Sequence, residues 1–262
     1  MRDILGGDFI PEMSDPDPVR RAQIQMKKPL PKRFYKDVTV SEADGSHAIL
    51  LDGRGIKTPA RNALAVPTAA IAELVAGEWA GQGEFIDPGS MPITRLANTA
   101  IDGIAKDQEA VFQDILKFST TDLLCYRADA PEGLVARQAA SWDPLIEWAA
   151  EDLGARFILI EGVIHQEQPA AAVEAFSDRL RRYDTPMQLA CLHTMTTLMG
   201  SAILTLALAD GRISLDEAWA LAHLDEDWTI EHWGSDFEAE HRRAARLAEM
   251  QAAGRALVAL RA

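Results

Sequence analysis

A candidate for phosphate chemistry is the segment GRGIKT at residues 53–58, in which two glycines precede a lysine and a threonine. A phosphate-binding loop needs a glycine directly before the lysine and a helix directly after the loop, because its backbone amides must converge on the phosphate. Ile56 occupies the position of that glycine, and the flanking residues resemble short strands. The segment therefore predicts a hairpin turn rather than a nucleotide site.

Metal binding is the second chemistry to consider, because several histidines lie among many carboxylates: His193, His223, His232 and His241. Glu238 and His241 have the Glu-x-x-His spacing of di-iron helical bundles, but such sites need that motif twice. The sequence has no second copy, no His-Glu-x-x-His motif and no clustered cysteines. We therefore expect no metal and no cofactor.

Nucleophilic catalysis has no recognisable motif either. Ser201 follows Gly200 without a Gly-x-Ser-x-Gly elbow, and neither Cys125 nor Cys191 lies in a Cys-x-x-Cys motif or a signature for a catalytic thiol. Catalytic groups need only spatial proximity, so an enzyme with an active site assembled from distant residues of the helical part is the alternative to a non-catalytic protein.

The segment 210–241 is unusually acidic. It holds ten acidic residues and a single base, Arg212, which leaves nine net negative charges. It also contains Trp219, Trp228 and Trp233. Mixed aromatic and charged surfaces are typical of protein interfaces, although a solvated acidic face above core tryptophans would give the same pattern.

The last helix is predicted to begin at Ser235, because Ser235 and Glu238 have the spacing of a capping box. With successive residues advancing about 100°, one predicted apolar stripe follows. Its members are Phe237, Glu240, Ala244, Leu247, Gln251, Gly254 and Val258. The opposite face carries Glu238, Arg242, Arg246 and Glu249.

Glu240 would then lie among apolar neighbours, where a carboxylate costs desolvation free energy unless it is paired. This position indicates a binding role, and the candidate partner-binding residues are Glu240, Phe237, Asp236 and Trp233. The alternative is a local ion pair between Glu240 and Arg243, which are three residues apart on the helix.

The elements that would position these residues are short β-like runs first and helices afterwards. The turn pairs Asp44-Gly45 and Asp52-Gly53 separate the runs. Helical patterns cover 69–82 after an N-capping Thr68, then 91–104, 108–118, 134–153, 170–183, 187–209, 214–224 and 237–260, interrupted by the strand-like FILIEGV near residue 160.

The predicted fold is α+β, with a small β-rich N-terminal domain followed by a larger all-α C-terminal domain. We expect a flexible arm at 1–31, the β domain at 32–66 and the α-helical domain at 67–262. The β module is too small to be stable alone, so it must pack against something larger.

The composition indicates which classes of partner and which cellular compartments are compatible with the sequence. The 262 residues carry a net charge of −14, which disfavours nucleic acid. The uncharged stretch 187–209 is interrupted by polar residues, so we expect a buried helix and no membrane insertion. Two cysteines suit a reducing compartment, and the acidic N-terminus lacks a targeting segment, which favours a bacterial cytoplasm, or the mitochondrial matrix if the source is eukaryotic.

Several long sequence segments are similar to those of a known family: RFYKDVTV, LDGRGIKTPARNALAVPT, EWAGQGEFIDPGSMPITRLANTAIDGI, TDLLCYRADAPEGLVARQAASWDPLIEWA, and WG followed by EAEHR. They resemble the alpha-subunit-specific assembly chaperones of ATP synthase. The strongest matches are Leu51, Asp52, Gly53, Arg54, Thr58, Pro59, Glu78, Trp79, Met91, Pro92, Thr94, Trp142, Asp143, Pro144, Trp233 and Gly234. The chain departs from the family at Thr229, where a glutamine is usual.

The resemblance implies a β-rich N-terminal domain and a helical C-terminal domain, with neither catalysis nor a cofactor. It implies that the protein, a monomer when free, binds the free alpha subunit over surface that a beta subunit later covers. Exposed apolar subunit surface is an aggregation hazard, which such a chaperone would suppress.

Overall fold

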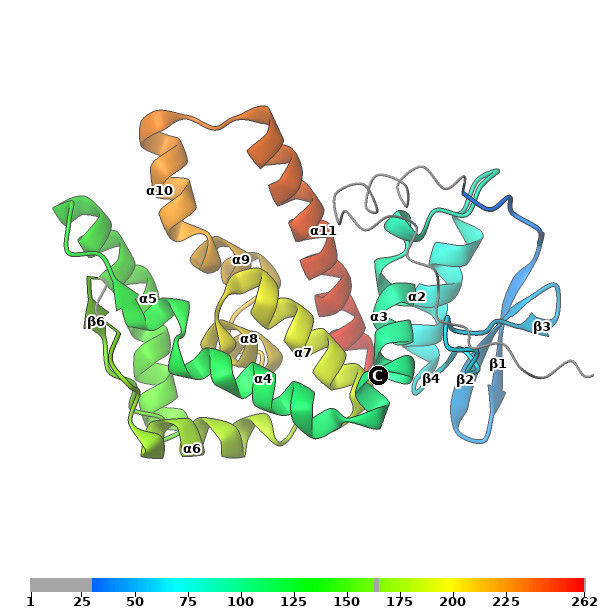
Figure 1. Ribbon diagram of the computed structural model, residues 1–262, viewed down its shortest axis with the longest axis horizontal. Coiled ribbons are helices and arrows are strands. Elements are labelled where there is room, and N and C mark those ends of the chain that lie inside the picture. The colour runs from blue at the N-terminus through cyan, green and yellow to red at the C-terminus, as the bar shows by residue number, and fades with distance from the viewer. Residues whose placement is uncertain (1–29, 163–164, 262) are drawn as a thin grey trace, which may run out of the picture. The chain divides into compact units, whose positions relative to one another are not determined.

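A computed structural model describes residues 30–162 and 165–261 of the chain (Figure 1). Its contacts define two units, one comprising Met1–Phe34 with Gln82–Asp87 and the other comprising Tyr35–Gly81 with Pro88–Ala262. The predicted arm at 1–31 lies almost wholly outside the described residues. In the first unit, Lys32 and Phe85 form an antiparallel bridge, and Arg33 N–H donates to the Glu84 carbonyl at 2.9 Å.

The second unit begins with a four-stranded antiparallel sheet. Its strands are β1 (Val38–Ala43), β2 (Ser46–Leu51), β3 (Arg54–Gly55) and β4 (Ala65–Val66). Strand β2 is central and pairs with the other three. Both predicted turns are present, because Asp44-Gly45 and Asp52-Gly53 have φ values of 51°, 71°, 48° and 76°, the left-handed conformation that tight hairpins require.

The short sheet is stabilised by the helix that follows it. Helix α2 (Ala69–Ala80) packs on β1 and β2 and buries Ile71 and Val75 beside Ile49 of β2. Thr68 caps this helix as predicted, because its Oγ1 accepts a hydrogen bond from Ile71 N–H. The same hydroxyl donates to the carbonyl of Ala259 at 2.8 Å, which joins the start of α2 to the end of the last helix.

Most of the rest of the unit is helical: α3 (Pro92–Asp102), α4 (Gln108–Thr120), α5 (Glu132–Asp152), α6 (Ala170–Leu180), α7 (Pro186–Met199), α8 (Ala202–Ala209), α9 (Leu215–Ala222), α10 (Leu224–Trp233) and α11 (Phe237–Ala259). Helix α7 lies at the centre and packs against α3, α4, α8 and α11. A small strand region followed by helices confirms the predicted α+β class.

The uncharged stretch 187–209 is two helices, not the single helix predicted from its pattern. Gly200 adopts φ = 68° and ends α7, and Ser201 caps α8 by accepting from Leu204 N–H. The buried Asp122 carboxylate accepts from Ser201 Oγ at 2.7 Å and from Ile203 N–H at 2.9 Å, so it stabilises the new helix start. No helix in the described ranges is long and apolar enough to cross a membrane.

Two further elements depart from the sequence pattern. Helix α10 covers a part of the acidic segment, between the helices expected at 214–224 and 237–260, where no helix was predicted. The strand-like run near residue 160 forms β6 (Ile160–Glu161), which pairs in parallel with β5 (Tyr126–Arg127), a strand that the sequence did not indicate. This two-stranded sheet runs beside α5 (Figure 1).

Candidate functional site

The four candidate binding residues come together where α10 meets α11, at the connection seen at the top of Figure 1. Gly234 ends α10 with φ = 81°. Asp236, not Ser235, caps α11, because the Asp236 carboxylate accepts from Ala239 N–H at 2.8 Å. The predicted capping box is therefore wrong by one residue, and the Ser235 hydroxyl donates to the Glu240 carboxylate instead.

Two large aromatic side chains at this connection are exposed. Trp233 is 76% and Phe237 is 83% accessible to solvent. Phe237 stacks on His241 with ring centroids 6.5 Å apart. We call residues 233–237 the aromatic tip. Exposed aromatic side chains close together in sequence are typical of surfaces that bury against another protein.

Glu240 does not lie on a buried stripe, and that prediction is wrong. Its side chain is exposed, as is Phe237, and the buried positions of α11 begin only at Met250. Val258, placed on the same stripe, is 66% exposed. The periodicity identified a shared face, but little covers the N-terminal half of the helix, whereas its C-terminal half packs on α7 and α3.

The alternative pair of Glu240 with Arg243 is also wrong. Arg243 pairs with Asp227 at 2.5 Å and with Glu226 at 4.0 Å, both on α10. The hydrogen bond to Asp227 raises the pKa of Arg243. Arg243 therefore ties α11 to α10 behind the aromatic tip.

Several acidic side chains of α10 form ion pairs and hydrogen bonds with side chains of the neighbouring helices. Arg137 of α5 pairs with Glu231 at 2.6 Å, and this contact lowers the pKa of the Glu231 carboxyl. Gln138 donates to Asp225 at 2.8 Å. Together with Arg243, these contacts hold α10 between α5 and α11, so much of the predicted acidic surface serves to fix the position of α10.

The three tryptophans of this segment have different environments. Trp219 is buried, and its ring contacts the His223 ring with the centroids 3.8 Å apart and the planes tilted by 34°. Trp228 packs over Gly133, where an added Cβ would lie 2.7 Å from the indole. Trp233 is thus the one of the three that is available for contact with another protein.

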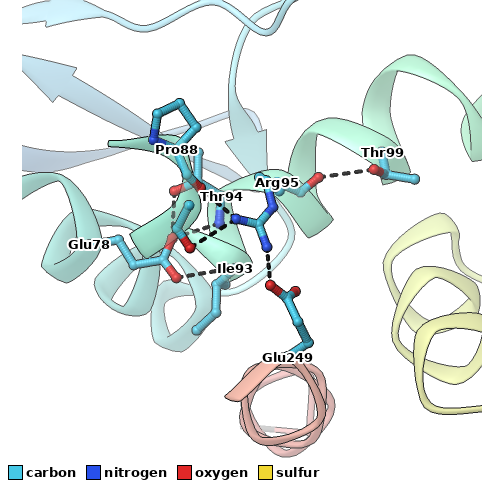
Figure 2. Close-up of polar contacts among 8 residues, drawn as sticks. Glu78, Pro88, Ile93, Thr94, Arg95, Thr99 and Glu249 are labelled. Carbon is cyan, nitrogen blue, oxygen red and sulfur yellow. Dashed lines mark hydrogen bonds and ion pairs between the residues drawn. The ribbon is translucent and has the colours of Figure 1, made fainter. Parts of the chain in front are cut away.

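Many residues that carry the family resemblance stabilise the fold. In Figure 2, Glu78 accepts from Ile93 N–H, Thr94 N–H and Thr94 Oγ1, each at 2.7 Å, and so caps the start of α3. Arg95 of α3 pairs with Glu249 of α11. Trp142 is fully buried and donates from Nε1 to the Leu221 carbonyl at 3.0 Å.

The histidines and cysteines do not assemble into a reactive centre. Within the described residues there is no group of three or more His, Cys, Asp or Glu side chains placed to hold a metal. Both cysteines are free and buried, and burial raises the pKa of the Cys191 thiol to about 12. A buried thiol with such a pKa is protonated near neutral pH and is a poor nucleophile.

Val135 of α5 and Leu159, which precedes β6, form a second exposed apolar surface that sequence reasoning missed. Their side chains are 36% and 45% exposed. Each is an isolated apolar residue, and their proximity depends on the unpredicted pairing of β5 with β6. No local sequence signal indicates it.

Exposed aromatic side chains held on a helical scaffold are typical of surfaces that bind other proteins. The family model described as ATP12 chaperone protein matches residues 32–150. Protein atp12, mitochondrial, of Schizosaccharomyces pombe is 27% identical over 215 residues, covering 78% of this chain and 74% of that protein.

Two solved structures are more similar. Atu1473 from Agrobacterium tumefaciens is 60% identical with a TM-score of 0.87, covering 94% of this chain and 92% of that one. Atp12 from Paracoccus denitrificans is 42% identical with a TM-score of 0.82, covering 87% and 98%. The chain therefore belongs to the ATP12 family of ATP synthase assembly chaperones, which confirms the expected class of chaperone rather than enzyme.

Proposed function

We propose that this protein binds the free alpha subunit of ATP synthase through its aromatic tip and covers the surface that the beta subunit later occupies. The observation that carries this proposal is the exposure of Trp233 and Phe237 on either side of the α10–α11 connection. The choice of the alpha subunit follows the resemblance to the alpha-specific assembly chaperones.

The chemistry of the tip suits a subunit interface awaiting its partner. An unassembled subunit exposes apolar surface, which aromatic side chains cover with little loss of conformational entropy. Around the two rings lie exposed carboxylates of Asp236, Glu238 and Glu240. They would orient a client, meaning the subunit held by the chaperone, through basic or amide groups at its surface.

The ion pairs that fix the position of α10, and with it the aromatic tip, also support a binding role. Helix α10 is fixed to α5 by the Arg137–Glu231 pair and to α11 by the Arg243–Asp227 pair. A preorganised surface loses less entropy on binding than a loop that must become ordered. Ordered helices therefore present the aromatic rings before the client arrives.

Affinity capture tests the proposal. The tagged protein is co-expressed with the alpha subunit alone, with the beta subunit alone, or with the complete synthase. We expect capture of the alpha subunit, and little capture of the beta subunit or of assembled synthase, in which the client surface is covered. Equal capture of both free subunits would contradict the proposal.

A further inference from the structure

Four Asp-Gly pairs occur in the chain, and all of them lie within the described residues: Asp44-Gly45, Asp52-Gly53, Asp102-Gly103 and Asp210-Gly211. An aspartate before a glycine can react with its own main chain, because the next nitrogen lies close to the side-chain carboxyl carbon and glycine has no side chain to block the approach. The reaction needs a carboxyl group that can turn toward that nitrogen and a nitrogen that is free to attack. The reactivity of each pair therefore depends on what holds these two groups in the fold.

Both reacting groups of the Asp102-Gly103 pair are held. The Asp102 carboxylate accepts three hydrogen bonds of 2.6 to 2.9 Å, from Thr58 Oγ1, Asn62 Nδ2 and Ala60 N–H. The hydrogen bond from Thr58 lowers the pKa of this carboxyl, which keeps it in the ionised form that cyclises poorly. The Gly103 N–H donates to the Thr99 carbonyl at 3.0 Å, so the attacking nitrogen is occupied as well.

The Asp210-Gly211 pair is held in the same way. The Asp210 carboxylate pairs with Arg179 Nε at 2.7 Å and accepts from the Tyr183 hydroxyl at 2.7 Å. The Gly211 N–H donates to the Leu208 carbonyl at 3.0 Å. Cyclisation at either pair would first have to break hydrogen bonds to a charged group, which are among the stronger ones in a protein.

The other two pairs form hairpin turns with nearly the same backbone. Asp44 and Gly45 have φ values of 51° and 71°, and Asp52 and Gly53 have φ values of 48° and 76°. All four residues are exposed. The Asp52 carboxylate is nevertheless tethered, because its Oδ1 accepts from the main-chain N–H groups of the two residues just before β1, at 3.0 and 2.8 Å.

Asp44 lacks such a tether. Within the part of the chain that the structure describes, its carboxylate takes part in no hydrogen bond or ion pair, and the Gly45 N–H donates to no acceptor. The neighbouring Ser46 hydroxyl donates to the Ala43 carbonyl at 3.0 Å and so does not hold the carboxylate either. Of the four pairs, this one alone has both reacting groups unengaged and exposed to solvent.

We propose that Asp44-Gly45 is a site of spontaneous isoaspartate formation in the folded protein. The Gly45 nitrogen attacks Cγ of the protonated Asp44 carboxyl; an N–Cγ bond forms, a Cγ–O bond breaks, and the hydroxyl leaves with the amide proton as one water. One water then opens the resulting succinimide ring. Addition at Cγ restores aspartate, and addition at the main-chain carbonyl carbon gives isoaspartate, whose chain runs through Cβ and Cγ.

The product changes the hairpin between β1 and β2. Isoaspartate adds one methylene to the main chain of the turn and leaves the former main-chain carbonyl of Asp44 as a free carboxylate. The two-residue turn sets the register in which Ala43 lies opposite Ser46 and Val38 opposite Leu51. A longer turn cannot keep this register, so the modified protein should melt at a lower temperature.

Incubation of the full-length protein at neutral pH and physiological temperature tests the site, and no client is needed. Digestion with the endoproteinase Asp-N, which cuts before aspartate but not before isoaspartate, followed by mass spectrometry, follows each of the four pairs over time. We expect isoaspartate at residue 44, and formation roughly ten-fold slower or more at the other three pairs, since each must first lose hydrogen bonds to its carboxylate. In urea, where those hydrogen bonds are lost, the four pairs should react at comparable rates.

Asparagine substitutions at the two hairpin turns provide a matched pair. Asp44→Asn and Asp52→Asn suit the same turn type and form the same ring with loss of ammonia instead of water. After melting curves confirm folding, Asp44→Asn should lose its amide roughly ten-fold faster or more than Asp52→Asn, whose side-chain oxygen can still accept from the two main-chain N–H groups. Asp44→Gly also suits the turn and lacks the reacting carboxyl, so it should keep its melting temperature during incubation. Equal rates at residues 44 and 52 in the folded protein, or isoaspartate at residue 44 only in urea, would overturn the proposal.

Discussion

Gly133 of α5 lies directly beneath the indole of Trp228 in α10: a Cβ at position 133 would stand 2.7 Å from the indole Cη2 atom. This contact is closer than real Cβ atoms allow, so any larger residue at position 133 must displace the Trp228 indole and disturb the packing of α10 on α5. The aromatic tip follows α10 along the chain, so its position depends in part on the absence of a side chain at Gly133.

We therefore expect Gly133→Ala to lower the free energy of unfolding by about 1–3 kcal/mol, as overpacked sites do, and to weaken alpha-subunit binding. Gly77→Ala is the control, since a Cβ there meets nothing within 4 Å. An alanine inside helix α2 should stabilise the protein by roughly 0.5–1 kcal/mol. Urea unfolding of both variants checks the pair, and equal stability of the two would show that α10 adjusts without cost.

Removing the aromatic rings of the tip should separate binding from folding. Trp233→Ala and Phe237→Ala delete side chains that are exposed, so the melting temperature should change little. Binding of the alpha subunit should weaken by about 2 kcal/mol or more for each, close to 30-fold, as at interface hot spots. Val258→Ala, at an exposed site near the other end of α11, should bind normally.

The charge of Glu240 gives a second test of the tip. Glu240→Gln keeps the shape and leaves an oxygen to accept from Ser235, and the side chain is exposed, so the melting temperature should change little. If the carboxylate contacts the client, the variant should fail to support synthase assembly, since loss of one charged partner commonly costs about 2–5 kcal/mol. Glu238→Gln, on an exposed carboxylate of the same turn, is the control. Normal assembly with Glu240→Gln would exclude Glu240 from the binding site.

Asp122 should produce a measurable pH dependence of stability. Burial raises the pKa of this carboxyl to about 6. The folded state then binds more protons than the unfolded state between pH 3.8 and about 6, so stability falls as the pH rises through that window. The total change is on the order of 3 kcal/mol at most.

Asp122→Asn cannot titrate, so its stability relative to wild type should improve as the pH rises from 4 to 6, even though the amide is a poorer acceptor for the start of α8. Burial lowers the pKa of His223, and the contribution of that group is present in both proteins and cancels in their difference. Urea unfolding at several pH values measures that difference. Parallel profiles for the two proteins would contradict the raised pKa.

Local chemistry explains which parts of the fold the sequence could predict. Asp44-Gly45 and Asp52-Gly53 demand left-handed turns, and Thr68 satisfies the start of α2, so these features depend on adjacent residues alone. The order of strands and helices follows from the same local patterns. The boundaries of the three predicted domains stay a prediction.

The site needed information that local patterns do not contain. Periodicity placed Glu240 and Phe237 on a common face, but whether a neighbouring helix covers that face depends on distant segments. Likewise, Arg243 pairs across to Asp227 rather than along its own helix. The clustering of Trp233 with Phe237 was predictable because only a short turn separates them. Their exposure became evident from the structure.

The hydrogen bond from Thr68 Oγ1 to the Ala259 carbonyl has a consequence for biosynthesis. Helix α11 packs on the central helix α7 and supplies Met250 and Leu257 to the core, so a helix that is synthesised after α2 and α7 is also one that completes the interior. The sheet and α2 emerge about two hundred residues earlier and must wait for that helix, as contacts distant in sequence form slowly. The aromatic tip is carried into place by the same helix, so a nascent chain acquires its binding surface only when its own core can close.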